Sequence, residues 1–589
     1  MSRAASVAGN GVPGLPQWRL KAMLWVAAAV ALVLMGKLFY LQVLQNSFLG
    51  GKAQDAHLLE RRLDPPRGAI TDRNGVTLAA NRSVYRLTAD PSILSEEAAE
   101  DAAAALAPIV KRPVKELEDK LLGDGQWVSL ATRLTPEQSQ KVRDKVKDLK
   151  LRGIGLEPSH ARVYPNGSLA SHVLGFSNYE NVGAYGIEGE YDEYLRGEPG
   201  KMAAEKDPSG NWLAIARQQI VPPKSGAEVE LTIDSTVQYF AEQELKRTVT
   251  EQSAKSGTII VMRPRTGEVL GMASYPDFKP QEFSQAKDPS VFVNPAVSLL
   301  YEPGSTFKII TMATGLAEGV ITPDTRINDR GYVNVYGQTI RNWDLRPHPN
   351  ESMTEVLMNS ANVGASYVSN KVGKDAFYRR LRQFGFGAPT GIDLQGETEG
   401  MLTLPSDRRW SPINLYTNGY GQGIGVTPIQ LITAHAAVAN GGLLMRPYVV
   451  SKVVRDGKVV RENKPTVVRR VLKPAVAETL KGMMQTVVEE GEYQVARLDG
   501  YTIGGKTGTS SIPKNGGFSE YTIASFVGYS YVKDPQFIVL VKIDEPKKSK
   551  WGSEVAAPAF KNLARRLYAY LNMPPDKNTT GFRDRATAP

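Results

Sequence analysis

A long run of apolar residues near the amino terminus is the clearest pattern along the chain. Ala22–Met35 contains only apolar residues, and after Gly36 and Lys37 the apolar character continues to Val43. We expect Ala22–Val43 to form one helix, because roughly 20 apolar residues in helical form span the hydrocarbon core of a bilayer. A cleaved signal peptide would have a shorter apolar core followed by small residues. The pattern therefore favours an uncleaved membrane anchor.

Basic residues set the expected orientation of this anchor. Arg3, Arg19 and Lys21 precede it, and no acidic residue does. Positive charge is retained on the cytoplasmic side of a membrane. Residues 1–21 are therefore expected to form a cytoplasmic tail, with everything from residue 44 onward on the other side of the membrane.

Residues 44–222 show helical and extended patterns but no catalytic cluster. Thr71–Ala80 predicts two strands joined at an Asn-Gly pair, which is favoured in tight hairpins. The alanine-rich Glu96–Val110 and the charged, amphipathic Thr135–Leu149 predict helices. We interpret this region as a non-catalytic pedestal, and Gln218–Gly226, with two adjacent prolines, as a linker.

Residues 223–573 begin with a strand pattern at Glu228–Asp234 that leads into a helix. Gly257–Met262 and Gly267–Ala273 predict a hairpin, Phe537–Ile543 another strand, and Ala557–Leu571 a closing helix. This arrangement predicts an α+β fold, an antiparallel sheet flanked by helices. The polar residues 574–589 are expected to be a disordered tail.

Composition excludes several classes of protein. The 71 basic and 61 acidic residues give a net charge of +10, and the excess is spread along the chain rather than gathered in a nucleic-acid-binding module. Attraction to anionic envelope polymers or lipid surfaces fits this charge better. The chain has no cysteine, and its five histidines form no metal-binding pair. We therefore expect no metal, no cofactor and no nucleic acid.

A first candidate for chemistry is Ser305-Thr306-Phe307-Lys308. The turn pattern of Tyr301–Gly304 precedes it and an apolar helical pattern follows. Ser305 is therefore expected on the first turn of a buried helix, where the dipole favours negative charge on its oxygen. Lys308 shares that helix face and can act as a base if burial and a second cation, Lys506, lower its pKa. A capping serine followed by a solvated lysine is the alternative.

A second candidate, Lys506-Thr507-Gly508-Thr509, lies on one strand of an expected hairpin. Gly508 weakens a strand interior unless something approaches its backbone closely, and a substrate lying along the strand would do so. The backbone N–H groups of Ser305 and Thr509 can then form an oxyanion hole. Lys506, Thr507 and Thr509 can hold a substrate carboxylate. The alternative is a surface lysine in a glycine-rich hairpin.

The third candidate, Ser360-Ala361-Asn362, lies in an expected turn between two helices. Its side chains can merely cap a helix. Beside Ser305 and Lys308, however, Ser360 can relay a proton to a leaving amine and Asn362 can hold a substrate amide. The order S-x-x-K, S-x-N, K-T-G is the pattern of penicillin-binding proteins and class A β-lactamases.

From the anchor to about residue 573, the chain resembles the class B penicillin-binding proteins, a family of membrane-anchored peptidoglycan transpeptidases. Further segments resemble landmarks of that family: Arg67–Gly75, Arg162–Pro165, Gly186–Gly189, Gly419–Gly423 and Val426–Leu431. The form of Tyr301–Ser305 is more similar to the division-type (septal) branch than to the elongation-type branch. Asn294-Pro295 departs from the family pattern, in which an arginine more often follows the asparagine.

The resemblance implies a penicillin-binding/serine β-lactamase-like transpeptidase domain, an elongated α/β pedestal of the dimerisation type and one transmembrane helix. It also implies that Ser305 attacks the D-alanyl-D-alanine bond of a stem peptide and that Lys308 takes its proton. An amine of a second stem peptide then resolves the acyl-enzyme. The implied partners are peptidoglycan stem peptides, β-lactam antibiotics, a membrane glycan polymerase of the shape/division family and other divisome proteins.

Other functions stay open at this point. Fast hydrolysis of a β-lactam needs a base that holds water on the ester, and neither Glu351 nor Glu355 is a clear candidate. An elongation-type transpeptidase and a D,D-carboxypeptidase share the same motifs. A non-enzymatic protein that activates a glycan polymerase through its anchor and pedestal is a further alternative.

Overall fold

The computed structural model describes residues 17–45, 58–125, 127–205, 219–491, 494–514 and 517–577. The chain forms two compact units, one of Met1–Asp64 with Pro199–Lys224 and one of Pro65–Glu198 with Ser225–Pro589. Every candidate catalytic residue belongs to the second unit. Most of the expected cytoplasmic tail, residues 1–16, lies outside the described residues.

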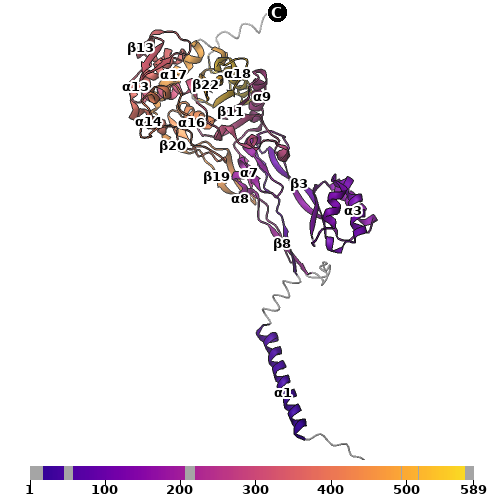
Figure 1. The fold of residues 1–589 in the computed structure, drawn as a ribbon. Coiled ribbons are helices and arrows are strands. Elements are labelled where there is room, and N and C mark those ends of the chain that lie inside the picture. Colours follow the sequence, from indigo (N-terminus) through magenta and orange to yellow (C-terminus); the bar gives the residue numbers. More distant parts are fainter. Residues whose placement is uncertain are drawn as a thin grey trace, which may run out of the picture. The chain divides into compact units, whose positions relative to one another are not determined.

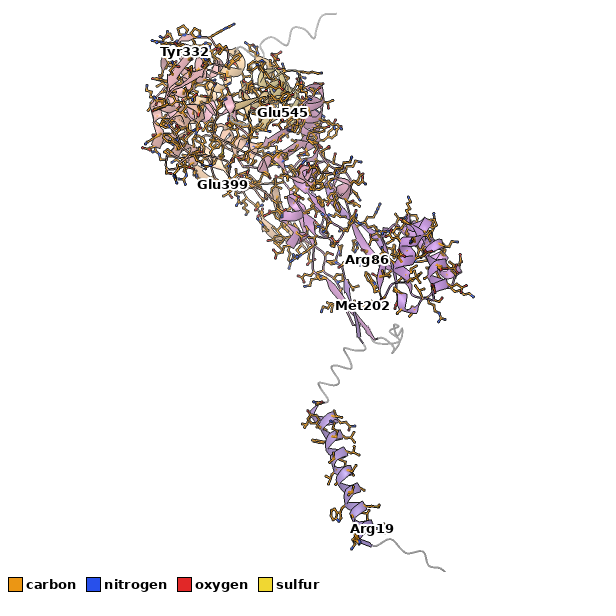
Figure 2. All side chains as sticks on the ribbon, viewed as in Figure 1. Arg19, Arg86, Met202, Tyr332, Glu399 and Glu545 are labelled. Carbon is orange, nitrogen blue, oxygen red and sulfur yellow. The ribbon has the colours of Figure 1, made fainter. Side chains whose placement is uncertain are left out.

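The expected apolar helix is present in the first unit. It consists of α1 (Gln17–Phe39) and a π-helical turn, η1 (Tyr40–Leu44). Its apolar span, Trp18–Leu44, is 27 residues long and exposed along its length, with Arg19 in the first turn (Figure 2). At about 1.5 Å per residue this span exceeds the roughly 30 Å of a bilayer core. The helix begins before residue 22, so residues 17–21 of the expected tail are helical.

The first unit also contains a three-stranded sheet in the order β1 (Leu58–Leu63), β8 (Gly200–Glu205) and β9 (Gln219–Val221). The prediction of a linker at 218–226 is wrong for Gln219–Val221, because this segment pairs with β8. Three residues are too few to show a strand period. Gln218 itself lies outside the described residues.

A seven-stranded sheet in the second unit draws on both regions predicted from the sequence. Its order is β19-β18-β10-β2-β3-β4, with β5 also paired to β3. The strands are β2 (Ile70–Thr71), β3 (Thr77–Ala89), β4 (Val128–Leu134), β5 (Ile154–Val163), β10 (Glu228–Leu231), β18 (Val450–Arg455) and β19 (Lys458–Glu462). The hairpin expected at Thr71–Ala80 is confirmed. Since β2 pairs with β10, one sheet crosses the expected boundary at residue 222.

Three helices and strands β3 to β5 enclose a separate small core. The helices are α3 (Glu96–Val110), α4 (Val114–Leu121) and α5 (Pro136–Asp148). Ala99, Ala103 and Leu106 of α3 are fully buried in this core, and Thr135 begins α5 with a capping box. Both helices predicted in this region are therefore confirmed.

A buried ion cluster joins segments that the sequence singled out separately. Arg67 and Arg162 each donate a hydrogen bond to the fully buried carboxylate of Glu188, and Arg67 also bonds Asp192. Burial raises the pKa of Glu188, but the neighbouring Arg162 and Arg67 outweigh it and hold that pKa below its usual value. Pairing of this kind is what makes a buried charge tolerable.

The catalytic region is built on a five-stranded antiparallel sheet in the order β12-β11-β23-β22-β21. Its strands are β11 (Ser256–Met262), β12 (Val269–Tyr275), β21 (Ile503–Lys514), β22 (Gly517–Ser530) and β23 (Phe537–Asp544). Ile259 and Val261 face one core, whereas Ile260 and Met262 face another. A strand buried on both faces in this way needs helices on both sides.

Two helices supply the first of these cores. Side chains of α9 (Ser235–Glu251) and α18 (Gly552–Tyr570) pack against Ile259 and Val261. Figure 1 shows both helices beside β11 and β22. The second core is formed largely by these helices: α11 (Lys308–Ala317), α12 (Met353–Met358), α13 (Asn362–Val372), α14 (Lys374–Gln383), α16 (Pro428–Ala439) and α17 (Pro474–Glu490). The predicted α+β fold is confirmed.

The carboxy-terminal segment differs from the expected tail. The Asp576 carboxylate accepts a hydrogen bond of 2.7 Å from the backbone N–H of Thr502, and Lys577 pairs with Glu489 at 2.7 Å. Residues 574–577 are thus attached to the catalytic region, because a polar segment can be held by ion pairs that no periodicity reveals. The remainder of the expected tail, residues 578–589, lies outside the described residues.

Candidate active site

Ser305 lies on a 3₁₀ turn, η5 (Gly304–Phe307), and α11 begins only at Lys308. The expected helical run is therefore present, but its first turn, which carries Ser305, is 3₁₀ and not α-helical. The two residues still share a face, because side chains three apart eclipse one another in a 3₁₀ helix. Gly304 has φ of +55°, and its N–H donates to Gly421 O at 3.0 Å. This hydrogen bond fixes the turn that presents Ser305.

Two glycines bring this turn against β21. A Cβ on Gly304 would lie 3.1 Å from Thr509 O, and a Cβ on Gly508 would lie 3.1 Å from Pro303 O. The close approach expected at Gly508 is real, because the serine turn and Ser525 lie against the side on which a Cβ would point. The glycines let the turn and β21 pack together, which places Ser305 and Thr509 on the same cavity.

The amine of Lys308 is completely buried and is held by the Ser-Ala-Asn loop. It donates to Asn362 Oδ1 at 2.8 Å, to Ser360 Oγ at 3.2 Å and to the backbone oxygen of Ser360. Among the described residues, no hydrogen bond joins it to Ser305 Oγ. The hydrogen bond through which Lys308 would take the Ser305 proton is therefore not formed here, although catalytic hydrogen bonds often tighten only when substrate binds.

Ser360 connects the two lysines. Its Oγ also accepts a hydrogen bond of 3.0 Å from the buried amine of Lys506. Ser360 lies in the turn between α12 and α13, as expected, and its φ of +53° is an uncommon left-handed value for a residue other than glycine. This backbone conformation turns both oxygens of Ser360 toward Lys308.

Both lysines have lowered pKa values. Burial is the main cause for Lys308, and the nearby cation of Lys506 lowers its pKa further, so that the pKa lies well below the usual value despite the opposing effect of Glu351 and Asp344. Burial lowers the pKa of Lys506 to about 7. Burial and a second cation, the two causes named from the sequence, thus both act on Lys308 in this structure. A neutral Lys308 is able to accept a proton.

Asn362 is occupied at both ends of its amide. Its Oδ1 accepts from Lys308, and its Nδ2 donates to Arg341 O at 2.9 Å. In this structure it orients the lysine amine, whereas the sequence suggested that it holds a substrate amide.

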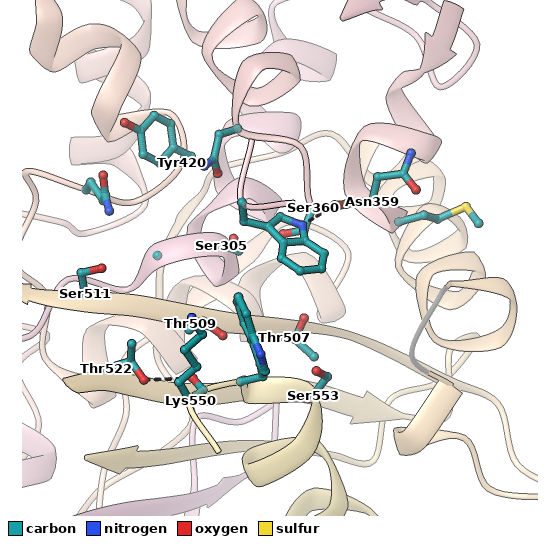
Figure 3. Close-up of a pocket in the computed structure, with 16 residues that line it drawn as sticks. Ser305, Asn359, Ser360, Tyr420, Thr507, Thr509, Ser511, Thr522, Lys550 and Ser553 are labelled. Atoms are coloured by element: carbon teal, nitrogen blue, oxygen red, sulfur yellow. Dashed lines mark hydrogen bonds between the residues drawn. The ribbon is translucent and has the colours of Figure 1, made fainter. Parts of the chain in front are cut away.

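The serine lies in an open cavity of roughly 300 Å³ (Figure 3). Thr507 and Thr509 of β21 line it, while Lys506 and Gly508 alternate with them and are buried. The Thr509 hydroxyl accepts a hydrogen bond of 3.0 Å from Gly552 N, which ties β21 to the start of α18. All three predicted motifs therefore meet at one cavity.

Several residues of the cavity wall were missed by sequence reasoning. Trp343 donates its indole N–H to Asn359 O at 2.9 Å, and its ring meets that of Trp551 edge to face at 5.1 Å. Lys550 and Tyr420 also line the cavity. Tyr420 lies in a segment that resembles a family landmark, but no sequence signal links Trp343 with Trp551, which are about two hundred residues apart.

Glu351 does not serve as a hydrolytic base in this arrangement. Its side chain lies toward Asn359 and Asp329, and burial together with the Asp329 carboxylate raises its pKa to about 8. No acidic side chain is found among the described residues that line the cavity. Among these lining residues, Ser305 thus has no neighbouring carboxylate that could hold water on an ester.

Comparisons with known proteins give the same picture. Residues 257–565 match the model of the penicillin-binding protein transpeptidase domain, and residues 62–231 match that of the penicillin-binding protein dimerisation domain. Stage V sporulation protein D of Bacillus subtilis is 35% identical over 95% of this chain and 87% of its own length. Peptidoglycan D,D-transpeptidase FtsI of Escherichia coli is 30% identical over 96% of this chain and 94% of its own length.

A solved structure is similar as well. Penicillin-binding protein 3 from Mycobacterium tuberculosis, complexed with aztreonam, has 26% identity and a TM-score of 0.68, covering 88% of this chain and 98% of that one. With its three motifs around one cavity and both characteristic regions matched, the chain belongs to the class B penicillin-binding proteins and is a serine-type peptidoglycan D,D-transpeptidase.

Proposed function

We propose that Ser305 attacks the carbonyl carbon of the D-alanyl-D-alanine bond in a donor stem peptide, forming an ester and releasing D-alanine. Neutral Lys308 accepts the hydroxyl proton, and Ser360 passes a proton to the departing amine. An amine of a second stem peptide then attacks the ester, which forms the crosslink and restores the Ser305 hydroxyl. The observation that carries this scheme is the contact of Ser360 Oγ with both lysine amines, at 3.2 Å and 3.0 Å.

The negative charge that develops on the carbonyl oxygen needs donors that are already in place. We assign this role to the backbone N–H groups of Ser305 and Thr509, which belong to two elements packed together through Gly304 and Gly508. Thr507 and Thr509 present their side chains to the cavity and are suited to hold the terminal carboxylate of the donor, with Lys506 supplying positive charge behind them.

We also infer the setting of the reaction. Helix α1 suits a single-pass anchor, and Arg19 and Lys21 before its apolar core favour a cytoplasmic amino terminus. The catalytic region then lies outside the cytoplasmic membrane, where peptidoglycan is made. The form of Tyr301–Ser305 and the similarity to FtsI support septal synthesis, with a membrane glycan polymerase and other divisome proteins as partners.

Labelling with penicillin tests the assignment of the nucleophile. The full-length protein in detergent is expected to form a stable adduct whose mass maps to Ser305, and Ser305→Ala is expected to abolish it. Ser511→Ala is a matched control, because Ser511 lines the same cavity and should be labelled normally. A label on another residue, or labelling of Ser305→Ala at the normal rate, would refute the assignment.

Product analysis separates transpeptidation from its alternatives. With a stem peptide and an acceptor amine, crosslinked dimers are expected, whereas a D,D-carboxypeptidase would release D-alanine and leave only trimmed peptides. An assembly role independent of chemistry would survive Ser305→Ala in cells, while crosslinking would not.

A further inference from the structure

Lys550 has an unusual place in the cavity wall. Among the described residues that line the cavity, it carries the only formally charged side chain, since Lys308 and Lys506 are buried behind the wall. Lys550 is exposed, and it takes part in no ion pair within the described part of the chain. Its positive charge is therefore available to a ligand.

The backbone around Lys550 is fixed to the catalytic sheet. The Thr522 hydroxyl of β22 donates to Lys550 O at 2.9 Å, the contact drawn dashed in Figure 3. Two residues further on, Gly552 N donates to the Thr509 hydroxyl at 3.0 Å. Lys550 is thus tied to the strand that carries the proposed oxyanion donor, rather than lying on a free loop.

Two indole rings form the surface next to this cation. The Lys550 amine lies 4.7 Å from the centroid of the Trp551 ring, and Trp551 contacts Trp343 at 5.1 Å. A cation over an aromatic face is held in position, and apolar walls reduce the dielectric screening of its field. A ligand that combines an apolar portion with an anionic group fits this corner.

We propose that Lys550, Trp551 and Trp343 form a subsite for a carboxylate carried on the acyl portion of the donor, the part that stays attached to Ser305. With the terminal carboxylate held at Thr507 and Thr509, as proposed above, the acyl portion is expected to extend along β21 beyond Thr509, where Lys550 lines the same cavity. The inference deepens the proposed function and rests on Ser305 being the acylated residue. It adds a specificity determinant that acts before any acceptor binds.

Two penicillins that differ by one group provide the probe. Benzylpenicillin and α-carboxybenzylpenicillin are identical except for a carboxylate on the acyl side chain. Acylation of the full-length protein in detergent by each compound is measured without acceptor, and the ratio of the two second-order rate constants is compared between variants. Any general loss of folding lowers both rates and leaves the ratio unchanged.

Lys550→Met is expected to lower the ratio of the carboxylated to the uncarboxylated compound about three- to fivefold, the upper end for an exposed ion pair. Lys550→Arg should retain the wild-type ratio. Lys548→Met removes an equal charge from a neighbouring exposed lysine that does not line the serine cavity, although Lys548 and Lys550 share an adjacent hollow, and it should leave the ratio unchanged. In 1 M salt, the wild-type ratio should fall toward that of Lys550→Met.

An unchanged ratio in Lys550→Met would overturn the proposed subsite. An equal effect of Lys548→Met would also overturn it, because it would indicate a general effect of positive surface charge and not a site at Lys550. An effect confined to the acceptor step, seen as altered crosslinking with the acylation ratio intact, would also overturn it. Mass spectrometry of the adducts keeps this result separate from a failure of the Ser305 assignment, since a wrong nucleophile would appear as a mislocated label in every variant.

Discussion

Removal of the Lys506 amine tests whether the second cation sets the basicity of Lys308. Both amines contact Ser360 Oγ, at 3.2 Å and 3.0 Å, so they are about 6 Å apart at most. Two unit charges at that separation repel by about 3 kcal/mol at an effective dielectric constant of about 20, and an energy of that size changes a pKa by about 2. Since the pKa of Lys506 is about 7, it is only partly charged near neutrality. We expect Lys506→Met to raise the pKa of Lys308 by about one to two units.

The assay is the rate of acylation by benzylpenicillin as a function of pH. In the wild type the rate should rise with pH as Lys308 becomes neutral, and in Lys506→Met this rise should be displaced by about one to two units toward alkaline pH. The maximum rate will also fall, because a hydrogen-bond partner of Ser360 is lost. Lys481→Met is the control, since Lys481 is an equally buried lysine whose amine pairs with Glu478. This substitution should leave the pH profile of acylation unchanged.

One result would refute this reasoning. If Lys506→Met lowers the maximum rate but the midpoint of its pH profile coincides with that of the wild type, Lys506 acts only on the substrate. The low pKa of Lys308 would then come from burial alone.

Two further substitutions test buried carboxylates. Burial and Asp329 raise the pKa of Glu351 to about 8 in the folded state, so its contribution to stability is present below the unfolded value of about 4.5 and is lost as pH rises through 8. Because Glu351→Gln stays neutral, its free energy of unfolding in urea should increase relative to that of the wild type between pH 5 and 9, by at most about 5 kcal/mol. A constant difference in this free energy over that range would contradict the prediction. Glu188→Gln leaves Arg162 without its counter-charge and Arg67 with Asp192 alone, which should cost about 3–5 kcal/mol and lower the melting temperature. An unchanged melting temperature would show that the cluster is not stabilising.

The parts of the site that depend on local spacing could be predicted from the sequence. Ser305 and Lys308 share a face in both α and 3₁₀ geometry, so the error in helix type did not change the conclusion. The hairpin that carries Lys506 followed from its strand pattern. The turn holding Ser360 followed from its position between two helical patterns.

Features that depend on distant contacts could not be predicted. The left-handed backbone of Ser360 and the reason for Gly508 both depend on what packs against them. The pairing of Trp343 with Trp551 joins a loop to the start of α18 and has no periodic signal. The short strand β9 and the ion pair of Lys577 were missed because single contacts, and not patterns, determine them.

The parallel pairing of β2 with β10 has a consequence for how this molecule can be divided. Val229 lies opposite Ile70, and both side chains are buried in the core that also contains the helix after Ser305. The dimerisation and transpeptidase regions should therefore melt as one cooperative block. A chain that begins at residue 223 would lack β2 and would leave one edge of β10 without hydrogen-bond partners, and unpaired strand edges promote aggregation. Exchange of catalytic regions between relatives should therefore succeed only when the strands around residue 70 are exchanged together with them.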